Sequence, residues 1–470
     1  MQGKNIIFLT AVMTPWMERS IGAYQLSSFL RSHGYTTQVI DFIHLFTKDQ
    51  LLEILEKFTD RTTRVVSISS TFLSSEVIIG AAQKTKIGSV PDILTDCLTE
   101  YKALYPNVKI VVGGAKALSY QNLDFVDHII TGYGEVPFLN FLKDGSKQKH
   151  INGDLFLDLF DSSKINHKFV DEDFIFPNET LPLEISRGCI FKCKFCAYPL
   201  NGKKKLDHIR DVELIKSELI NNYEKWKVTN YLISDDTFND SNEKLQMLHD
   251  MIVSLPFKIS FVCYLRLDLL YHFRDTQLEM LENMGLKTCH FGVESFNPPT
   301  AKFIGKGLSE DKTKDFLLFL KERWQNKISF MCTFISGLPF ETKESCIDTG
   351  NWCRENDITF WMMPLFINPT HVYKSDIDIN YQQYGYQLYP DNSWTSNLMT
   401  FQEAKQIADS FTTDPRTHRI SAWNMFAILS LNLYNVDELY NMTYADLDKM
   451  KMFSAGKQRF VEYVEKIKAI

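Results

Sequence analysis

The sequence contains no apolar run that approaches the ~20 residues that a membrane-spanning helix needs. It has no surplus of positive charge either, because 51 Lys and Arg against 58 Asp and Glu give a formal net charge of −7 at pH 7. The basic footprint of nucleic-acid binding is therefore missing. The short apolar run Asn5–Leu9 lacks a small-residue cleavage site and predicts a core strand rather than a signal peptide. Internal repeats and low-complexity tracts are absent, and 44% hydrophobic with 23% charged residues is typical of a soluble globular protein.

Three of the nine cysteines lie in one short loop. Cys189, Cys193 and Cys196 have the spacing C-x3-C-x2-C, and the aromatic Phe195 stands just before the last of them. Cysteine thiolates are the ligands of iron–sulfur clusters, which normally take four. If three thiolates hold a four-iron cluster, one iron stays open to a substrate or cofactor. The loop therefore predicts a catalytic metal centre, with these three cysteines as its ligands.

A structural zinc site is the alternative for this loop, with a fourth ligand such as His208. Structural zinc sites usually come as two ligand pairs, and the sequence has no second C-x2-C or C-x2-H pair, which favours the cluster. The six other cysteines are scattered through apolar segments and are predicted to be small buried hydrophobes. An odd number of cysteines around a cluster motif indicates a reducing compartment, which predicts a cytoplasmic protein.

The first third of the chain alternates apolar strand-like runs with helical patterns. This alternation predicts a doubly wound α/β domain with a parallel sheet and helices on both faces. Ligands of such sheets bind at the carboxyl ends of the strands. The strand-like runs are Asn5–Leu9, Gln38–Phe42, Val65–Ser69, Val108–Val112 and Asp127–Ile130.

A second alternating series follows a polar stretch, residues 146–180, which we interpret as a linker between domains. The cysteine loop comes directly after the first strand of this series, at the rim where parallel barrels place their chemistry. The chain beyond residue 380 predicts a small, mostly helical region. The six strands of the second series are Leu183–Ile185, Tyr231–Ile233, Ile259–Tyr264, His290–Val293, Ser329–Phe334 and Thr359–Phe366.

The loop resembles that of the radical S-adenosylmethionine (SAM) enzymes in its cysteine spacing, its preceding Arg187-Gly188 and its aromatic Phe195. This resemblance implies a [4Fe-4S] cluster whose fourth iron is chelated by the amino and carboxylate groups of SAM. It implies one-electron cleavage of SAM to methionine and a 5′-deoxyadenosyl radical, with Phe195 near the adenine. It also implies a partial (β/α)6 barrel, which the six strand–helix units match.

Two aspartates end the second strand of the barrel, where the radical SAM pattern approaches the SAM amino group. Asp235 and Asp236 are therefore candidates for SAM binding, and helix capping by one of them is the alternative. Arg266 ends the third strand and could pair with the SAM carboxylate in bidentate fashion. Its alternative is a surface ion pair with Asp268.

Two further strand ends carry candidate SAM contacts. Glu294 ends the fourth strand, and a charge inside a barrel is costly unless it is partnered, which favours a role toward the ribose or amino group of SAM. Gly337, in the segment after the fifth strand, resembles the family's adenine-side motif and would admit the ring closely.

The N-terminal third is similar to the Rossmann-like cobalamin-binding domains that are fused to radical SAM barrels. Paired glycines after a strand let a backbone approach a large ligand closely, and hydroxyls there can bond a nucleotide tail. Ordinary turn chemistry of an α/β domain is the alternative, and the D-x-H-x-x-G motif that supplies a histidine to cobalt is absent. The candidate cobalamin-binding residues are Pro15, Gly22, Ser69, Ser70, Gly113, Gly114, Gly132 and Glu135.

These features predict four parts: a cobalamin-binding-type domain at residues 1–145, the linker, a radical SAM barrel at 181–380 and the helical region at 381–470. The resemblance implies cobalamin-dependent methylation of an unactivated carbon in a small-molecule or peptide substrate. It also implies an external one-electron reductant such as flavodoxin or ferredoxin. One alternative is a cobalamin-independent rearrangement or cyclisation with a degenerate or substrate-binding first domain. Another is a non-catalytic redox or cobalamin sensor.

Overall fold

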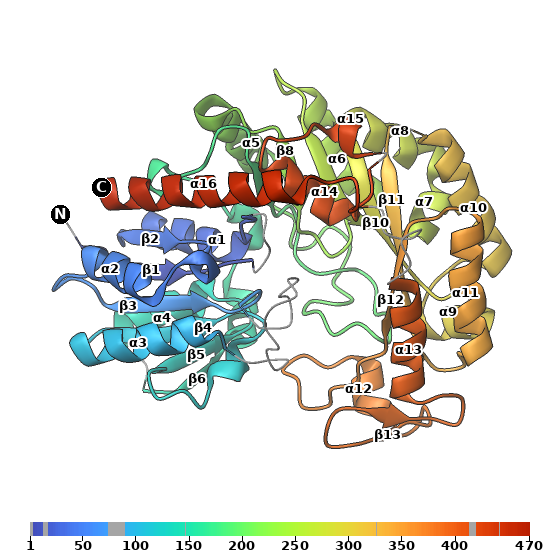
Figure 1. The fold of residues 1–470 in the computed structure, drawn as a ribbon, viewed down its shortest axis with the longest axis horizontal. Helices are drawn as coiled ribbons and strands as arrows, with labels where there is room; N and C mark the ends of the chain where they lie inside the picture. The colour runs from blue at the N-terminus through green and yellow to red at the C-terminus, as the bar shows by residue number, and fades with distance from the viewer. Residues whose placement is uncertain are drawn as a thin grey trace.

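The computed structural model describes residues 3–12, 17–73, 90–145, 147–325, 327–412, 420–440 and 442–470. Two parallel sheets of six strands each lie side by side, the first built from the N-terminal part of the chain and the second from its middle (Figure 1). None of the described helices is both long and apolar enough to cross a bilayer. The predicted α/β class, with a doubly wound domain followed by a partial barrel, is confirmed.

The first sheet has the strand order β2-β1-β3-β4-β5-β6, and all of its pairs are parallel. Successive side chains of a strand point to opposite faces of the sheet, and both faces of this sheet carry apolar side chains. Each face therefore packs against a layer of helices. Helices α1 (Ile21–Ser32) and α4 (Glu135–Asp144) cover one face, while α2 (Lys48–Phe58) and α3 (Asp92–Leu104) cover the other. The strands are β1 (Ile6–Leu9), β2 (Thr37–Ile40), β3 (Val65–Ser69), β4 (Lys109–Gly113), β5 (His128–Thr131) and β6 (His150–Asn152).

Strand β6 lies inside the stretch that the sequence predicts as a linker. Only its central residue, Ile151, is buried, so no apolar period marks it in the sequence. It pairs in parallel with β5 and completes the first sheet. The rest of the stretch contains three short 3-10 helices: η4 (Gly153–Leu159), η5 (Ser162–Lys164) and η6 (Asp171–Asp173). Two more lie earlier, η1 (Ile43–Leu45) and η3 (Ala117–Tyr120).

The second sheet runs β7 to β12 in sequence order, and each neighbouring pair is parallel. This sequential order is that of an open barrel of six strand–helix units. Its strands are β7 (Thr180–Leu183), β8 (Asn230–Ile233), β9 (Ser260–Leu265), β10 (Leu286–Glu294), β11 (Ser329–Ser336) and β12 (Phe360–Pro364). Its helices are α5 (Val212–Trp226), α6 (Asn242–Val253), α7 (Leu267–His272), α8 (Arg274–Met284), α9 (Pro298–Ile304), α10 (Glu310–Arg323) and α11 (Lys343–Glu355).

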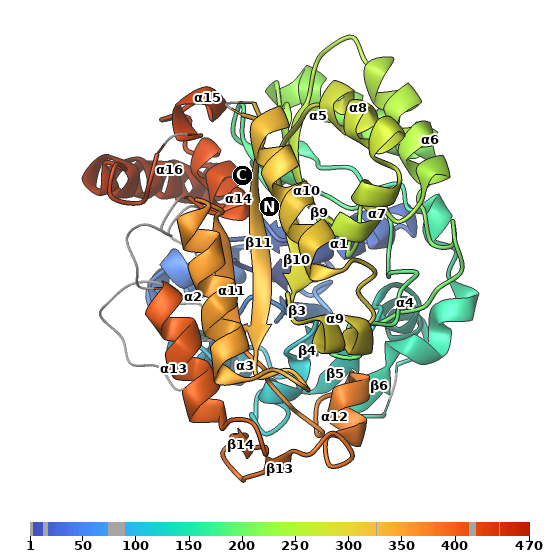
Figure 2. The same ribbon diagram turned by 90° about the vertical axis from the view of Figure 1, so that its right-hand side faces the viewer.

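The chain beyond residue 380 is mostly helical, and its helices join the two sheets. Helix α13 (Phe401–Thr412) packs beside β12, on the outer face that α10 and α11 also cover (Figure 2). Helix α14 (Ala422–Leu429) packs on the opposite face, against residues of β8 and β9. Helix α16 (Lys449–Ala469) crosses back to the first sheet (Figure 1), where Tyr463 is fully buried. The remaining elements are α12 (Asp376–Asn380), α15 (Val436–Leu439) and the hairpin of β13 (Gln387–Leu388) and β14 (Trp394–Thr395).

Candidate functional site

The cysteine loop leaves the carboxyl end of β7 and closes on itself. The Cys189 amide donates to the Leu200 carbonyl at 3.3 Å, and the Gly202 amide donates back to the Cys189 carbonyl at 2.7 Å. Gly188 has φ +74°, and a Cβ at this position would run into Leu200. The glycine before the first cysteine is therefore required by the closure of the loop.

Each of the three loop thiols has a hydrogen-bond donor beside its sulfur. Cys189 Sγ accepts from the Phe191 amide at 3.5 Å, and Cys196 Sγ accepts from Asn201 Nδ2 at 3.1 Å. Cys193 Sγ accepts from Arg266 Nη1 at 3.2 Å. Donors of this kind stabilise cluster thiolates and tune the cluster that they hold. The donor set and its surroundings therefore fit a [4Fe-4S] cluster with three protein ligands.

The zinc alternative required a fourth ligand, for which the sequence offered His208. In the structure, His208 Nδ1 instead lies 3.2 Å from Ser162 Oγ. Among the described residues, no three His, Cys, Asp or Glu side chains come together in the way that would hold a single metal ion. All nine cysteines, each within the described part of the chain, are free thiols.

The two aspartates at the end of β8 have different surroundings. Asp235 is fully buried and accepts from the Ile185 amide at 2.8 Å, the Ser186 amide at 2.9 Å and the Ser186 hydroxyl at 2.7 Å. Lys244 Nζ, also buried, lies 2.9 Å from Oδ2, the oxygen that also accepts from the Ser186 hydroxyl. Asp235 therefore fastens β8 to the start of the cysteine loop. Helix α6, the next one, is capped by Ser241, so neither aspartate is its cap.

Asp236 is the more exposed of the two aspartates. Its side chain is half-buried, and burial together with the neighbouring Asp235 charge raises the pKa of Asp236 to about 6. The Lys203 charge and a hydrogen bond from the Gly188 backbone oppose this rise in the pKa. A partly desolvated carboxyl group is a candidate for binding a cationic ligand group. Its role toward the SAM amino group remains a prediction.

Arg266 and Glu294 are both buried at strand ends and both have protein partners. Arg266 makes a two-pronged pair with Asp268, with Nε at 2.9 Å and Nη2 at 2.6 Å from the carboxylate. The pair is buried, whereas the sequence alternative was a surface ion pair. Glu294 has φ +71° and lies 3.6 Å from Lys306 Nζ, and burial raises the pKa of Glu294. The sequence motifs did not indicate Lys306, whose ammonium also lies 5.7 Å from the centre of the Phe195 ring.

Gly337 has φ +86°, and a side chain at this position would collide with the indole of Trp394. The hydroxyl of Tyr386 donates to its carbonyl at 2.7 Å. Packing against the hairpin of β13 and β14 therefore accounts for this glycine without an adenine ring. The adenine contact remains a prediction.

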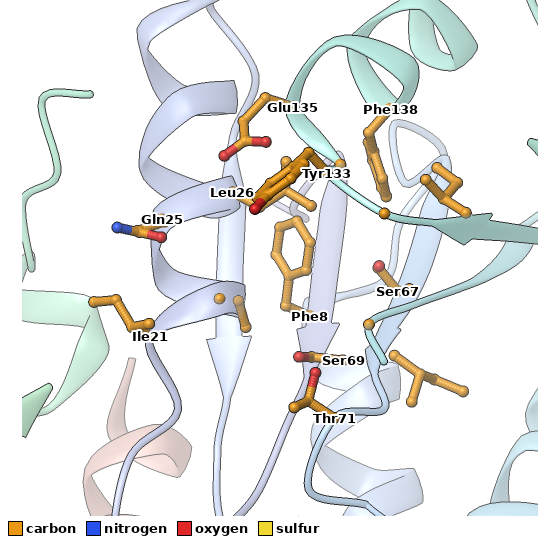
Figure 3. Close-up of a pocket in the computed structure, with 18 of the residues that line it drawn as sticks. Phe8, Ile21, Gln25, Leu26, Ser67, Ser69, Thr71, Tyr133, Glu135 and Phe138 are labelled. Carbon is orange, nitrogen blue, oxygen red and sulfur yellow. The ribbon is translucent and has the colours of Figure 1, made fainter. Parts of the chain in front are cut away.

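A cavity of about 220 Å³ opens at the carboxyl ends of the first sheet, between α1 and α4 (Figure 3). Because side chains alternate along strands, four neighbouring strands present one face to it. Hydroxyls of Ser67, Ser69 and Thr71 lie on the strand side, opposite Gln25 of α1 in the view of Figure 3. No histidine lines the described part of this cavity. The strand residues that line it are Phe8, Ser67, Ile68, Ser69, Val111, Gly113 and Ile130.

Six of the eight predicted cobalamin contacts line this cavity: Gly22, Ser69, Gly113, Gly114, Gly132 and Glu135. Ser70 does not, because its hydroxyl is turned to the Gly113 carbonyl at 2.8 Å and ties β3 to β4. Pro15 lies outside the described residues. At Gly114 (φ +99°) a Cβ would come within 2.7 Å of Thr71 Oγ1, so this turn needs glycine. An apolar floor, three hydroxyls and a glycine-lined mouth fit the nucleotide tail of a corrinoid.

Arg187 connects this cavity to the cysteine loop, two residues before Cys189. Its guanidinium lines the cavity and lies 2.7 Å from Glu135 and 3.1 Å from Glu184. It also lies over the ring of Tyr133, 5.0 Å from its centre. The sequence motifs marked Arg187 only as part of the loop, because its partner Glu135 is 52 residues away.

We expect Arg187→Met to lower the free energy of unfolding by about 3–5 kcal/mol, since it leaves Glu135 and Glu184 buried without their cation. Denaturant unfolding of the purified protein measures this change. Lys405→Met, which breaks the exposed pair with Asp409, is the matched control and should cost less than about 1 kcal/mol. Equal losses for the two variants would show that the Arg187 pairs add nothing beyond a surface contact.

The structure thus joins a doubly wound sheet with a cavity at its strand ends to an open barrel that begins with a three-cysteine loop. Residues 183–353 match the model of the radical SAM superfamily, so the chain contains a radical SAM domain, as predicted. The match begins at the end of β7 and includes all three loop cysteines.

A curated relative, described as the uncharacterized methyltransferase PH0819 of Pyrococcus horikoshii, is 26% identical over 285 residues. This alignment covers 55% of the present chain and 60% of the relative's length. Among solved structures, TsrM from Kitasatospora setae with tryptophan and a SAM analogue matches with a TM-score of 0.64 at 14% identity. The match covers 92% of this chain and 96% of TsrM. OxsB with aqua-cobalamin matches with a TM-score of 0.62 at 14% identity, over 99% of this chain and 72% of OxsB. Both similarities concern the fold.

Proposed function

We propose that the protein is a cobalamin-dependent radical SAM methyltransferase that methylates an unactivated carbon. The observation that supports this proposal best is that the segment leading into the cysteine loop also lines the cavity of the first domain. Glu184 and Arg187 belong to the segment that leads into the loop, yet they line the cavity of the first domain. A corrinoid in that cavity would therefore lie beside the centre held by the three cysteines.

When bound, the cluster and SAM supply a 5′-deoxyadenosyl radical, and the corrinoid supplies a methyl group. The protein's own residues hold and shield these groups. Cys189, Cys193 and Cys196 provide the thiolates, and the buried Asp235–Lys244 pair fixes the strand from which their loop starts. The partly exposed carboxylate of Asp236 is suited to the SAM amino group.

The descriptions of the solved relatives support the cofactors. TsrM is described as a radical SAM methyltransferase with cobalamin and a [4Fe-4S] cluster bound, and OxsB as a cobalamin-dependent radical SAM enzyme. The proposal extends to a small-molecule or peptide substrate and to an external one-electron reductant such as flavodoxin or ferredoxin. Thiolate-held clusters need reducing surroundings, which supports a cytoplasmic location.

Products of SAM test the proposal. The anaerobically reconstituted protein is incubated with SAM, dithionite, hydroxocobalamin and a panel of candidate substrates, and nucleoside products are quantified by mass spectrometry. The proposal predicts both 5′-deoxyadenosine and S-adenosylhomocysteine. 5′-Deoxyadenosine alone would support the cobalamin-independent radical reaction instead, and the absence of both would support the sensor alternative.

A further inference from the structure

Arg266 is the charged group in direct contact with a cluster thiol. Its side chain is 6% exposed, and its Nη1 donates to Cys193 Sγ at 3.2 Å. The groups within hydrogen-bond distance of the other two sulfurs are neutral: the Phe191 amide and the Thr237 hydroxyl at Cys189, and the side-chain amide of Asn201 at Cys196. Among the three thiols of the described loop, Cys193 is thus the one in hydrogen-bond contact with a full positive charge.

The guanidinium is fixed on every side. Nε and Nη2 are held by Asp268, Nη2 also donates to the Gly305 carbonyl at 2.9 Å, and the plane lies 3.7 Å from the centre of the Phe191 ring. The two-pronged face of the fork is therefore occupied by Asp268. The remaining nitrogen, Nη1, donates to the sulfur. The guanidinium therefore has no second pair of free N–H groups that could bind the carboxylate of SAM in bidentate fashion.

Asp268 is itself anchored, so the pair acts as one unit. Its carboxylate accepts from the Leu269 amide at 3.0 Å and the Gly307 amide at 3.2 Å. The Arg266 guanidinium contacts the Cys193 thiol, and the Asp268 carboxylate lies on the far side of the guanidinium. Hydrogen bonds and positive charge at a cluster sulfur favour the more negatively charged, reduced state of the cluster.

We propose that Arg266 is a positioning residue that raises the reduction potential of the cluster through Cys193, and that Asp268 limits this effect. The inference rests on the proposed function, in which one electron from an external donor takes the cluster from its 2+ to its 1+ charge state. Because the two residues carry opposite charges, their removal shifts the potential in opposite directions.

The test is a redox titration of the reconstituted protein with dithionite in the absence of SAM, followed by electron paramagnetic resonance, with iron and sulfide content measured in parallel. We expect Arg266→Met to move the midpoint potential to a more negative value and Asp268→Asn to move it to a more positive value. The midpoint potential of Arg266→Lys should lie between those of the wild type and Arg266→Met, because lysine keeps the positive charge and loses the bidentate pair with Asp268. Arg323→Met, which breaks a half-exposed fork with Glu282 at the end of α10, should leave the potential unchanged.

Shifts of both variants in the same direction would show a merely structural role and overturn the inference. An unchanged potential with weakened SAM binding in Arg266→Met would assign Arg266 to the SAM carboxylate and overturn it as well. If Arg266→Met does not retain iron, the opposite shifts of Arg266→Lys and Asp268→Asn decide the question. A wild-type protein that forms no cluster would contradict the proposed function and the inference together, whereas a cluster with unmoved potentials would contradict the inference alone.

Discussion

Cys193→Ala is expected to remove the iron–sulfur centre and to abolish SAM cleavage. A four-iron cluster with three protein thiolates is already one ligand short of the usual four, and this substitution leaves two. It also leaves the Arg266 guanidinium facing an apolar methyl group in place of a thiolate. Iron and sulfide analysis and the visible absorbance of the anaerobically reconstituted variant measure the loss.

Cys97→Ala is the matched control for this experiment. Cys97 is a buried free thiol of α3, in the core on the helix α2–α3 side of the first sheet. The variant should retain the iron, the sulfide and the 5′-deoxyadenosine activity of the wild type. Retention of the cluster by Cys193→Ala, or its loss from Cys97→Ala, would refute the assignment of the loop as the cluster site.

Gly113→Leu is expected to exclude the corrinoid while leaving the cluster in place. Gly113 follows Val111 by two residues on β4, so an added side chain points to the same face, which is the cavity face. A Cβ there meets only the Ile130 carbonyl, at 3.7 Å, so the backbone accepts a side chain without strain. Overfilling a well-packed site costs about 1–3 kcal/mol, which lowers the affinity for cobalamin by about 5- to 150-fold.

Cobalt retained after desalting, measured beside iron, quantifies this prediction. Gly113→Ala adds a single methyl group and should retain most of the cobalt. Unchanged cobalt content in Gly113→Leu would mean that any bound corrinoid lies elsewhere, and a parallel loss of iron would mean that the variant disturbs the whole protein.

Local pattern accounts for most of the fold. Strand β3 has the predicted bounds, Val65–Ser69, because a short β-branched run between polar segments identifies a buried strand. Strand β6 could not be predicted, since one buried isoleucine in three residues has no period. Helix α16 lies in the region that was predicted to be mostly helical, and nothing in its pattern indicates that it packs on the first sheet.

The candidate site divides in the same way. The cysteines and the paired glycines were predictable because each motif is local and stands at a strand end. The contacts of Arg187 with Glu135 and of Arg266 with Cys193 were not, because they join residues 52 and 73 positions apart. At Gly337 the local motif did not indicate the contact that the structure shows. The glycine resembles a ligand-binding motif, but in the structure Trp394 packs against it.

The metal content of the wild-type protein tests the account most directly. The protein is reconstituted anaerobically with iron, sulfide and hydroxocobalamin, desalted and analysed for iron, sulfide, cobalt and zinc beside its ultraviolet–visible spectrum. The account predicts about four irons and four sulfides per chain, together with near-stoichiometric cobalt. An iron–sulfur spectrum without cobalt would contradict the cobalamin-dependent function, and zinc without iron would contradict the radical SAM chemistry itself.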